Sequence, residues 1–464
     1  MDDGAKGASG EAQAAADGSR RPITRAQLHV VAVLGFCGLV SAADNWFVSP
    51  ALPAIARGLS VLPAAATVVL TAYMVPYGAL QPVCGAIADR VGRLRLLRAI
   101  VLGLCAGTVL CAAAPSLELL VAARILTGCF AAGIISVSQA FVGDVVEPAR
   151  RGGAVGMLMG ITFTGQGLSA GLGGILTELV GWRVAFASFG ILAAAAWILL
   201  STLREPDGAW SRTPGGSGGV SAAGGDGFRE TGGSGDASAA GGDGRADVLD
   251  SETRGRARAA AGRRGPGAES PAAAFLAAAV RIFLGPRRAV FLLACSTGVL
   301  FLGVYGLMGT FLNAVCGLGS TEAGLVMMLY GVFCLVGGAL SGRLGGRLGL
   351  PGVIAVGEAS AVAAACALLA SAATASWVPA LVAAGCLGLG YILVQPTLVT
   401  LSMDADPGRA GLCTGLIGSG VFIGGGVGSA LGGLLLGAGG YLALWGVAAA
   451  GLAVQLAASR RLLG

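Results

Sequence analysis

Two acidic side chains lie inside long apolar stretches of the sequence, where a carboxylate can carry protons. They are Asp44 and Glu358, whereas nearly all the other acidic residues lie in polar segments or at the ends of apolar ones. A low-dielectric surrounding disfavours the charged form of a carboxylate, so such a group can bind and release a proton near neutral pH. If a cationic or polar substrate competes for that carboxylate, protonation expels the substrate, which is antiport. We therefore predict that Asp44 couples proton and substrate movement, with Arg124 acting on its affinity for protons.

A structural role is the alternative for each carboxylate. Asp44 could be held in a buried ion pair, for example with Arg124, because a lone charge in lipid is costly enough to require a partner. Glu358 lies near the expected start of a helix, where the macrodipole stabilises a carboxylate. For Glu358 the structural interpretation and a role in coupling are equally favoured.

Polar and aromatic side chains also occur at intervals inside the apolar stretches. An apolar pocket with a few such groups suits an amphipathic ligand, although each group alone is more often a partner in helix–helix hydrogen bonding. The candidates for lining such a pocket are Asn45, Trp46, Tyr73, Tyr77, Gln81, Gln139, Gln166, Tyr305, Asn313, Tyr391 and Gln395.

Membrane-spanning helices are the elements that must position these residues. Of the 464 residues, 55% are hydrophobic and 12% are charged, which is about half the charged fraction of a soluble protein. Apolar windows of about 20 residues predict a span each. They lie near 28–50, 63–86, 96–114, 117–141, 154–178, 183–203, 288–312, 322–342, 352–374, 377–401, 411–436 and 440–459. The predicted fold class is an all-α membrane protein with twelve transmembrane helices.

The distribution of arginine predicts the orientation of these spans. Basic residues gather before the first span and in every second loop, whereas the alternate loops contain only Arg57 and Arg183. By the positive-inside rule both termini face the cytoplasm, and the expected location is a bacterial inner membrane. The first 26 residues lack the apolar core of a cleavable signal peptide, so the first span is expected to direct insertion.

The composition also divides the chain into segments. Residues 204–285 are rich in small, polar and charged residues and cannot bury enough apolar surface to fold. The residues 272–284 within them have the composition of a short interfacial helix. We therefore expect a cytoplasmic tail, 1–26; a six-helix bundle, 27–203; a disordered cytoplasmic linker, 204–285; a second six-helix bundle, 286–460; and a cytoplasmic end, 461–464.

The two expected bundles resemble each other in sequence. Residues 85–93 resemble 338–346, and 147–150 resemble 406–409. From the second match the alignment runs without gaps to Gly173-Gly174 and Gly432-Gly433. A duplicated six-span unit of constant orientation is the parallel-repeat architecture of many secondary transporters.

The loop after the second span carries the pattern Gly-x-Ile-x-Asp-Arg-x-Gly-Arg at 85–93, and with it the chain resembles the major facilitator superfamily. The resemblance covers all the expected spans and implies a charged cluster at the cytoplasmic edge, which holds the two halves together in the outward-facing state. By this resemblance Asp144, at the end of span four, is placed to pair with Arg90 or Arg93. The implied cytoplasmic gate consists of Gly85, Asp89, Arg90, Gly92, Arg93 and Asp144.

A second pattern, Arg124-x-x-x-Gly128, resembles a motif of the 12-span drug:proton antiporters, in which this arginine is linked to proton transfer. The pairs Asp44-Asn45 and Gly181-Trp182 strengthen the resemblance to that branch. The Gly-Pro pair of a third motif, which marks the antiporters, is absent from the aligned residues 169–174. The direction of transport therefore stays open.

These features predict a secondary active transporter that exports drugs or small amphipathic compounds by proton antiport. The alternatives are an exporter or proton symporter of a specific metabolite (a sugar, amino acid or organic acid) and a membrane-embedded binding sensor. A hydrolase is not expected, because the Gly-x-Ser-x-Gly string at 167–171 lies in an apolar helix and His29 is the only histidine. No metal site or cofactor is expected. The expected partners are membrane lipid, protons and a small organic substrate, with no nucleic acid, and the chain is expected to act as a monomer.

Overall fold

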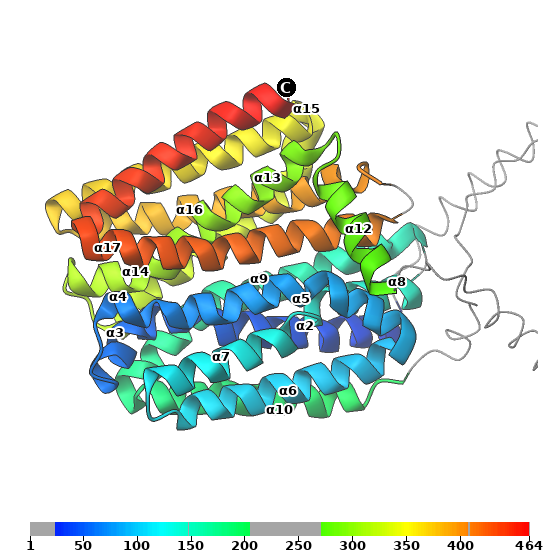
Figure 1. Ribbon diagram of the computed structural model, residues 1–464, viewed down its shortest axis with the longest axis horizontal. Coiled ribbons are helices and arrows are strands. Elements are labelled where there is room, and N and C mark those ends of the chain that lie inside the picture. The colour runs from blue at the N-terminus through cyan, green and yellow to red at the C-terminus, as the bar shows by residue number, and fades with distance from the viewer. Residues whose placement is uncertain (1–23, 147, 205–270, 407–408, 464) are drawn as a thin grey trace, which may run out of the picture. The chain divides into compact units, whose positions relative to one another are not determined.

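The computed structural model describes residues 24–146, 148–204, 271–406 and 409–463, with the side chains at 86, 89, 148–153, 271, 272 and 410 left aside (Figure 1). The expected N-terminal tail, apart from its last three residues, and most of the expected linker lie outside this description. Residues 1–210 and 282–464 belong to one compact unit, and 211–281 belong to another. The second unit is described only from Pro271, where a helix begins.

The described residues are almost entirely helical. The first half contains α2 (Arg25–Trp46), α3 (Val48–Gly58), α4 (Pro63–Ala66), α5 (Val68–Val91), α6 (Arg93–Ala113), α7 (Leu117–Ala131), α8 (Ile134–Val145), α9 (Pro148–Val180) and α10 (Trp182–Ser201). The second contains α12 (Pro271–Phe283), α13 (Arg288–Thr297), the π-helix η1 (Gly298–Leu302), α14 (Gly303–Ala314), α15 (Ser320–Thr374), α16 (Val378–Met403) and α17 (Ala410–Leu463).

These helices account for the twelve expected spans. Among the described residues nine helices are long and apolar enough to cross a membrane. Two of the nine are pairs of helices joined at a kink, at Gly349 in α15 and at Gly440 in α17. Dividing these two gives eleven such helices among the described residues, and α9 is the twelfth. Each predicted span then coincides with one helix or with a pair of consecutive short helices. The predicted all-α class is confirmed, and α12 coincides with the helix expected near 272–284.

Glycines in the left-handed region make the sharp turns between consecutive spans. Gly92 has φ of 104° between α5 and α6, and Gly181 has φ of 88° between α9 and α10. Gly440, with φ of 67°, stands 259 positions after Gly181, which is the offset of the ungapped sequence match. Equivalent turns therefore occur in the two halves, because glycine adopts positive φ without a steric penalty.

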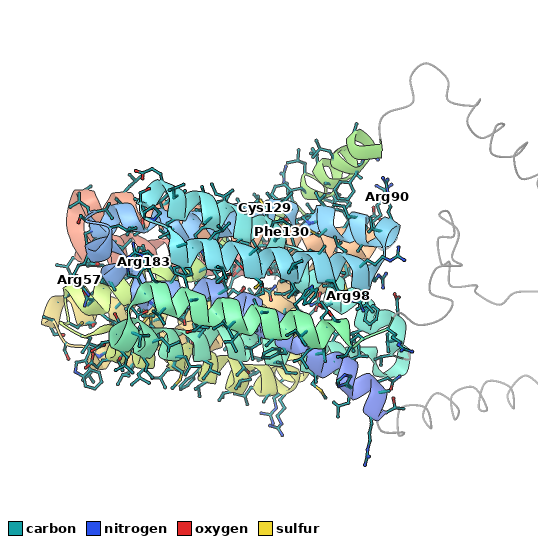
Figure 2. The ribbon with its side chains drawn as sticks, turned by 90° about the horizontal axis from the view of Figure 1, so that it is seen from below. Arg57, Arg90, Arg98, Cys129, Phe130 and Arg183 are labelled. Atoms are coloured by element: carbon teal, nitrogen blue, oxygen red, sulfur yellow. The ribbon has the colours of Figure 1, made fainter. Side chains whose placement is uncertain are left out.

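Within the larger unit the helices of the two halves form two groups (Figure 1). In the first half α2 packs on α9 and α10, and α5 on α7; in the second, α15 packs on α16 and α17. Two helix pairs, α5 with α17 and α9 with α15, make extensive contacts between the groups. Figure 2 shows Arg90 and Arg98 at one end of the helices and Arg57 and Arg183 at the other. We call these the arginine-rich end and the opposite end.

The helices α9 and α15 touch near the opposite end. Gly167 lies against Gly331, and Gly174 against Ser320, so closely that neither glycine has room for a Cβ. Ser49 of α3 donates a hydrogen bond to the carbonyl oxygen of Gly306 in α14 at 2.7 Å. The carboxylate of Glu178 also accepts a hydrogen bond from the backbone N–H of Thr321, at 2.8 Å, in the first turn of α15.

Toward the arginine-rich end the same two helices separate. Gly160 and Gly167 lie seven positions apart on one face of α9, as do Gly338 and Gly331 on α15. No described atom lies within 4 Å of where a Cβ of Gly160 would stand, and Gly338 meets only Ile392 of α16, at 3.9 Å. Along α9 and α15 the two halves thus touch at the opposite end and separate toward the arginine-rich end, whereas α5 and α17 remain in contact as far as Pro82 and Gly415.

Candidate functional site

Asp44 and Arg124 form a buried ion pair in the first half. Arg124 lies in α7 and Asp44 in the last turn of α2, and their side chains are 0% and 1% exposed. Arg124 Nη1 donates to Asp44 Oδ2 at 2.8 Å and to the backbone carbonyl of Asp44 at 3.2 Å. The structural alternative for Asp44 required a charged partner. That partner is Arg124, which the sequence analysis had identified.

Two other helices and a second residue of α2 complete the surroundings of this pair. Thr108 of α6 donates its hydroxyl proton to Asp44 Oδ1 at 2.8 Å. The guanidinium carbon of Arg124 lies 4.3 Å from the ring centroid of Tyr73 in α5, in a cation–π arrangement. Arg124 Nη2 donates to Asn45 Oδ1 at 3.1 Å, and Asn45 Nδ2 is buried without a hydrogen-bond partner among the described residues.

Such a pair is neutral as long as Asp44 is charged. A proton on Asp44 would leave the charge of Arg124 in a low-dielectric interior without its counter-ion, which is strongly unfavourable. Binding a proton there therefore favours a rearrangement of α2 relative to α7. This arrangement can convert protonation into helix movement.

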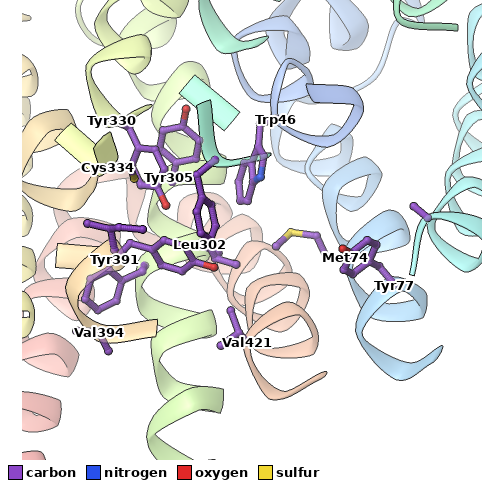
Figure 3. Packing of buried hydrophobic residues seen from close by; sticks show 14 of the residues in the cluster. Trp46, Met74, Tyr77, Leu302, Tyr305, Tyr330, Cys334, Tyr391, Val394 and Val421 are labelled. Carbon is purple, nitrogen blue, oxygen red and sulfur yellow. The ribbon is translucent and has the colours of Figure 1, made fainter. Parts of the chain in front are cut away.

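An aromatic cluster joins the two halves next to this pair (Figure 3). The ring of Trp46, two residues after Asp44, stands edge-on to Tyr305 of α14 with 5.0 Å between centroids. Tyr305 packs on Tyr330 of α15 at 4.2 Å, and Tyr391 of α16 follows at 6.1 Å from Tyr330. The Tyr330 hydroxyl is buried with no partner among the described residues. The cluster presents apolar rings with polar ends, a surface suited to amphipathic molecules.

A second pair of tyrosines lies on α5. Tyr73 and Tyr77 stack with centroids 5.8 Å apart, and Tyr77 meets Phe422 of α17 at 4.3 Å. The Tyr73 hydroxyl donates to the carbonyl of Ser41 at 3.2 Å. Tyr73 thus contacts Arg124 on one side and, through Tyr77, the other half of the molecule.

Glu358 lies in the second half, away from these residues. It is fully buried, and its carboxylate accepts hydrogen bonds from Gln455 and Ser459, both on α17. No ion pair of Glu358 within 4.0 Å is found in the described part of the chain. The sequence grouped Glu358 with Asp44, but the structure gives the two carboxylates separate surroundings.

The expected gate residues lie where α5 meets α6 and at the end of α8. Arg93 forms an ion pair with Asp144 and donates to the carbonyl of Ala140 at 2.6 Å. Arg90 is exposed, Gly85 lies within α5, and Gly92 supplies the turn. The pairing expected for Asp144 is found, with Arg93, while the side chain of Asp89 lies outside the described part. The Arg93–Asp144 pair joins two helices of the first half.

The remaining candidates are spread more widely. Gln81 is buried against Gly418 of α17, and Gln166 is buried in α9. Gln139 donates to the sulfur of Met159 at 2.9 Å. Asn313 donates to the carbonyl of Leu318 at 2.8 Å and so stabilises the loop after α14. Gln395 is half-buried on α16.

Several residues around the ion pair, in the aromatic cluster and beside Glu358 were not among the candidates. Tyr330 was missed because span eight was not considered to line a pocket, and Thr108 because a lone threonine in an apolar span carries no distinctive pattern. Ser459 and Gln455 lie at the end of the last span, where polar residues ordinarily mark the membrane surface. Only their position beside Glu358 shows that they face inward.

Comparison with known proteins agrees with this architecture. The family model described as Major Facilitator Superfamily matches residues 34–429. A solved bacterial homologue of the human lysosomal transporter Spinster, in an inward-facing and unoccupied conformation, superposes with a TM-score of 0.63. That likeness has 18% identity and covers 95% of this chain and 98% of the other.

Curated relatives include exporters and resistance proteins. The chain is 34% identical over 141 residues to the puromycin resistance protein pur8 of Streptomyces alboniger, which is 30% of this chain and 28% of that one. It is 27% identical over 177 residues to citrate exporter 1 of Aspergillus niger, 38% of this chain and 34% of that one. The matches thus span about a third of the length of these relatives.

Proposed function

The chain belongs to the Major Facilitator Superfamily, and from this premise we propose that it exports a small amphipathic organic compound in exchange for protons. Members of the family are membrane transporters. The resistance protein and the citrate exporter among the similar proteins support outward transport of an organic compound. The aromatic cluster, whose rings carry no formal charge, supports an amphipathic cargo.

A single observation carries the proposal of proton coupling: the buried ion pair lies two residues from the contact between the halves. Asp44 Oδ2 is 2.8 Å from Arg124 Nη1, and Trp46 is the residue of α2 whose ring meets Tyr305. A proton that breaks the pair acts on the last turn of α2 and thereby on this contact. Asp44 is the proposed proton carrier, and Arg124 determines its affinity for protons.

The cycle we propose is alternating access. Residues 27–203 rock against 286–460, and the aromatic cluster with the buried glutamines contacts the cargo between them. With the arginine-rich end on the cytoplasmic side of a bacterial inner membrane, contact along α9 and α15 at the opposite end supports an assignment to the inward-facing state. Both termini then lie in the cytoplasm, and one chain suffices for the cycle.

The cytoplasmic gate forms in the opposite state of this cycle. In the present state Arg93 is paired with Asp144 inside the first half. We propose that Asp89, Arg90 and Arg93 meet the second half when the arginine-rich end closes. Asp144→Asn should then reduce turnover and leave equilibrium binding of the cargo nearly unchanged. Equal loss of both would contradict the gate assignment.

The test is proton-coupled transport in inverted membrane vesicles that carry an imposed pH gradient. A panel of fluorescent dyes and drugs, including puromycin, is added to vesicles with the wild type or with Asp44→Asn. If panel members dissipate the gradient with the wild type and not with Asp44→Asn, proton antiport carried by Asp44 is supported. Vesicles from cells without the transporter control for passive leakage.

A narrow metabolite cargo is the second candidate, because one similar protein is a citrate exporter. If no dye or drug moves protons with either protein, the multidrug interpretation fails. Citrate and other organic acids are then tested in the same vesicles. A panel member that binds but never crosses the membrane, with or without a pH gradient, would instead support a binding sensor.

A further inference from the structure

The surroundings of Glu358 contain more polar groups than a structural contact in a membrane helix requires. Ser459 donates to Oε2 of Glu358, and Gln455 Nε2 donates to Oε1 at 3.1 Å. Gln455 Nε2 also lies 2.9 Å from Oγ1 of Thr297, the last residue of α13. All four side chains are at least nine-tenths buried, and they come from three separate spans.

Apart from Arg460, the described groups that act on Glu358 are neutral. The span α16 contributes Gly390, Leu393 and Val394 against the neighbouring Gly357, and α13 contributes the hydroxyl of Thr297 through Gln455. The charged group that acts on Glu358 is Arg460 of α17, an exposed residue that forms no ion pair with it within 4.0 Å. A buried carboxylate without a paired cation is far more costly than a buried carboxylic acid.

The hydrogen bonds around Glu358 fit an acid better than an anion. Oγ of Ser459 is also 3.1 Å from the carbonyl oxygen of Leu456. A hydroxyl has one proton and cannot donate to both acceptors. If Glu358 is protonated, it donates to Ser459, and Ser459 donates to Leu456. Oε1 of Gln455 is buried without a partner among the described residues. If the side-chain amide of Gln455 is flipped, this oxygen can accept a hydrogen bond from the protonated carboxyl group of Glu358 in place of Ser459.

From this arrangement we infer that Glu358 is a second proton-binding site, in the second half of the molecule and separate from Asp44. Ser459 and Gln455 are positioning residues that exchange donor and acceptor roles when the proton binds. The proton enters from water at the arginine-rich end, where Arg460, the residue after Ser459, is exposed. The inference holds whatever cargo Asp44 serves.

The site is connected to the region between the halves through the seventh span. Thr297 is followed directly by the π-helix η1, whose Phe301 lies 6.4 Å from Tyr391 between centroids. Beyond η1, Tyr305 contacts Trp46. π-Helical turns occur frequently at functional sites, because they place one extra residue in a helix that can shift. A change at Gln455 and Thr297 therefore acts on the seventh span, Arg288–Ala314, which also contains Tyr305.

The test needs no substrate. Infrared difference spectra of the purified full-length protein in lipid nanodiscs are recorded as the pH is varied, and the C=O stretching band of a protonated carboxylic acid is followed. We expect a band that titrates in the wild type, is lost in Glu358→Gln and remains in Asp44→Asn. Ser459→Ala, which keeps the carboxyl group, should shift the pH midpoint of that band. Ser429→Ala, a buried serine on the same helix, should not shift it.

The inference is overturned if Glu358→Gln leaves every titrating carboxylic-acid band in place, or if Ser459→Ala and Ser429→Ala give the wild-type midpoint. Should Glu358→Gln fail to fold, the two serine variants decide the question alone. Failure of the dye experiment with Asp44→Asn does not affect this result, because the band is measured without any cargo.

Discussion

The two buried carboxylates of this transporter have opposite electrostatic surroundings. Asp44 has the guanidinium of Arg124 at 2.8 Å, a threonine hydroxyl and a cation–π contact nearby. Glu358 has a serine hydroxyl and an amide, and the charged group that acts on it is the exposed Arg460. One site is an ion pair and the other is a single acid among neutral groups.

The difference means that a proton has opposite effects at the two sites. At Asp44 it destroys a neutral pair and leaves a buried cation, so the site changes shape when it is protonated. At Glu358 it removes a lone charge, so the protonated site fits the surrounding helices better. Each site lies next to an irregular point in a span. Near Asp44 it is the break at Phe47 between α2 and α3, and near the Glu358 site it is the π-helix η1.

The largest expected effect is that of Arg124→Ala. It leaves Asp44 buried without its cation and should cost about 3–5 kcal/mol of stability, measured by thermal unfolding in detergent. Adding Asp44→Asn to Arg124→Ala should recover much of the loss, because no charge then remains. If the loss of stability in the double variant equals the sum of the losses in the two single variants, the ion pair does not stabilise the first half.

Neutralising each carboxylate in turn compares the sites directly. Asp44→Asn leaves the Arg124 charge unpaired and should cost about 3–5 kcal/mol. Glu358→Gln replaces one neutral hydrogen-bonding group by another of the same shape and should change stability by about 1 kcal/mol or less. Thermal unfolding of both variants under the same conditions measures the difference. Equal losses would remove the distinction between ion pair and lone acid.

A third prediction tests whether the contact between α9 and α15 closes the opposite end. Gly167→Ala places a methyl group against the backbone of Gly331 and should destabilise the closed opposite end by about 1–3 kcal/mol. Gly160→Ala is the matched control, since the same face of α9 is open there. Spin-label distances across the opposite end should lengthen only in Gly167→Ala. Equal distances in the two variants would show that this contact does not close that end.

The smallest expected difference concerns the hydroxyl donors of the two carboxylates. Thr108→Val removes a hydrogen bond to a charged group and should cost about 1.5–3 kcal/mol, whereas Ser459→Ala removes one from a neutral acid and should cost about 0.5–1.5 kcal/mol. Unfolding midpoints rank the two. The reverse order would mean that Glu358 carries the charge and Asp44 does not.

The sequence predicted the helices well because few backbone conformations can span a membrane. Backbone groups in lipid must be satisfied within the segment, so an apolar window of sufficient length becomes a helix. The kinks at Gly349 and Gly440 and the turn at Gly92 follow from glycine in the same way. The rarity of charge inside spans also identified Asp44, Arg124 and Glu358 without any knowledge of their neighbours.

The sequence did not predict which helix faces which. Tyr330 is one more aromatic residue in an apolar span until α15 packs against α14 and brings it to Tyr305. Asn313 looked like Asn45 as a candidate, but it stabilises a loop at its own helix end. The rotation of a helix about its axis depends on contacts with other helices, and apolarity on all sides of a span removes the periodicity that would reveal it.

The sequence by itself thus determined the twelve-helix class, the duplicated halves and the three charged residues inside the spans, because each depends on local composition or on glycine geometry. Only the tertiary structure decided that Asp44 meets Arg124 while Glu358 meets Ser459 and Gln455. Those partners lie 80 to 101 residues away in the chain. The electrostatic character of a buried charge depends on what other segments bring to it, and no local pattern contains that information.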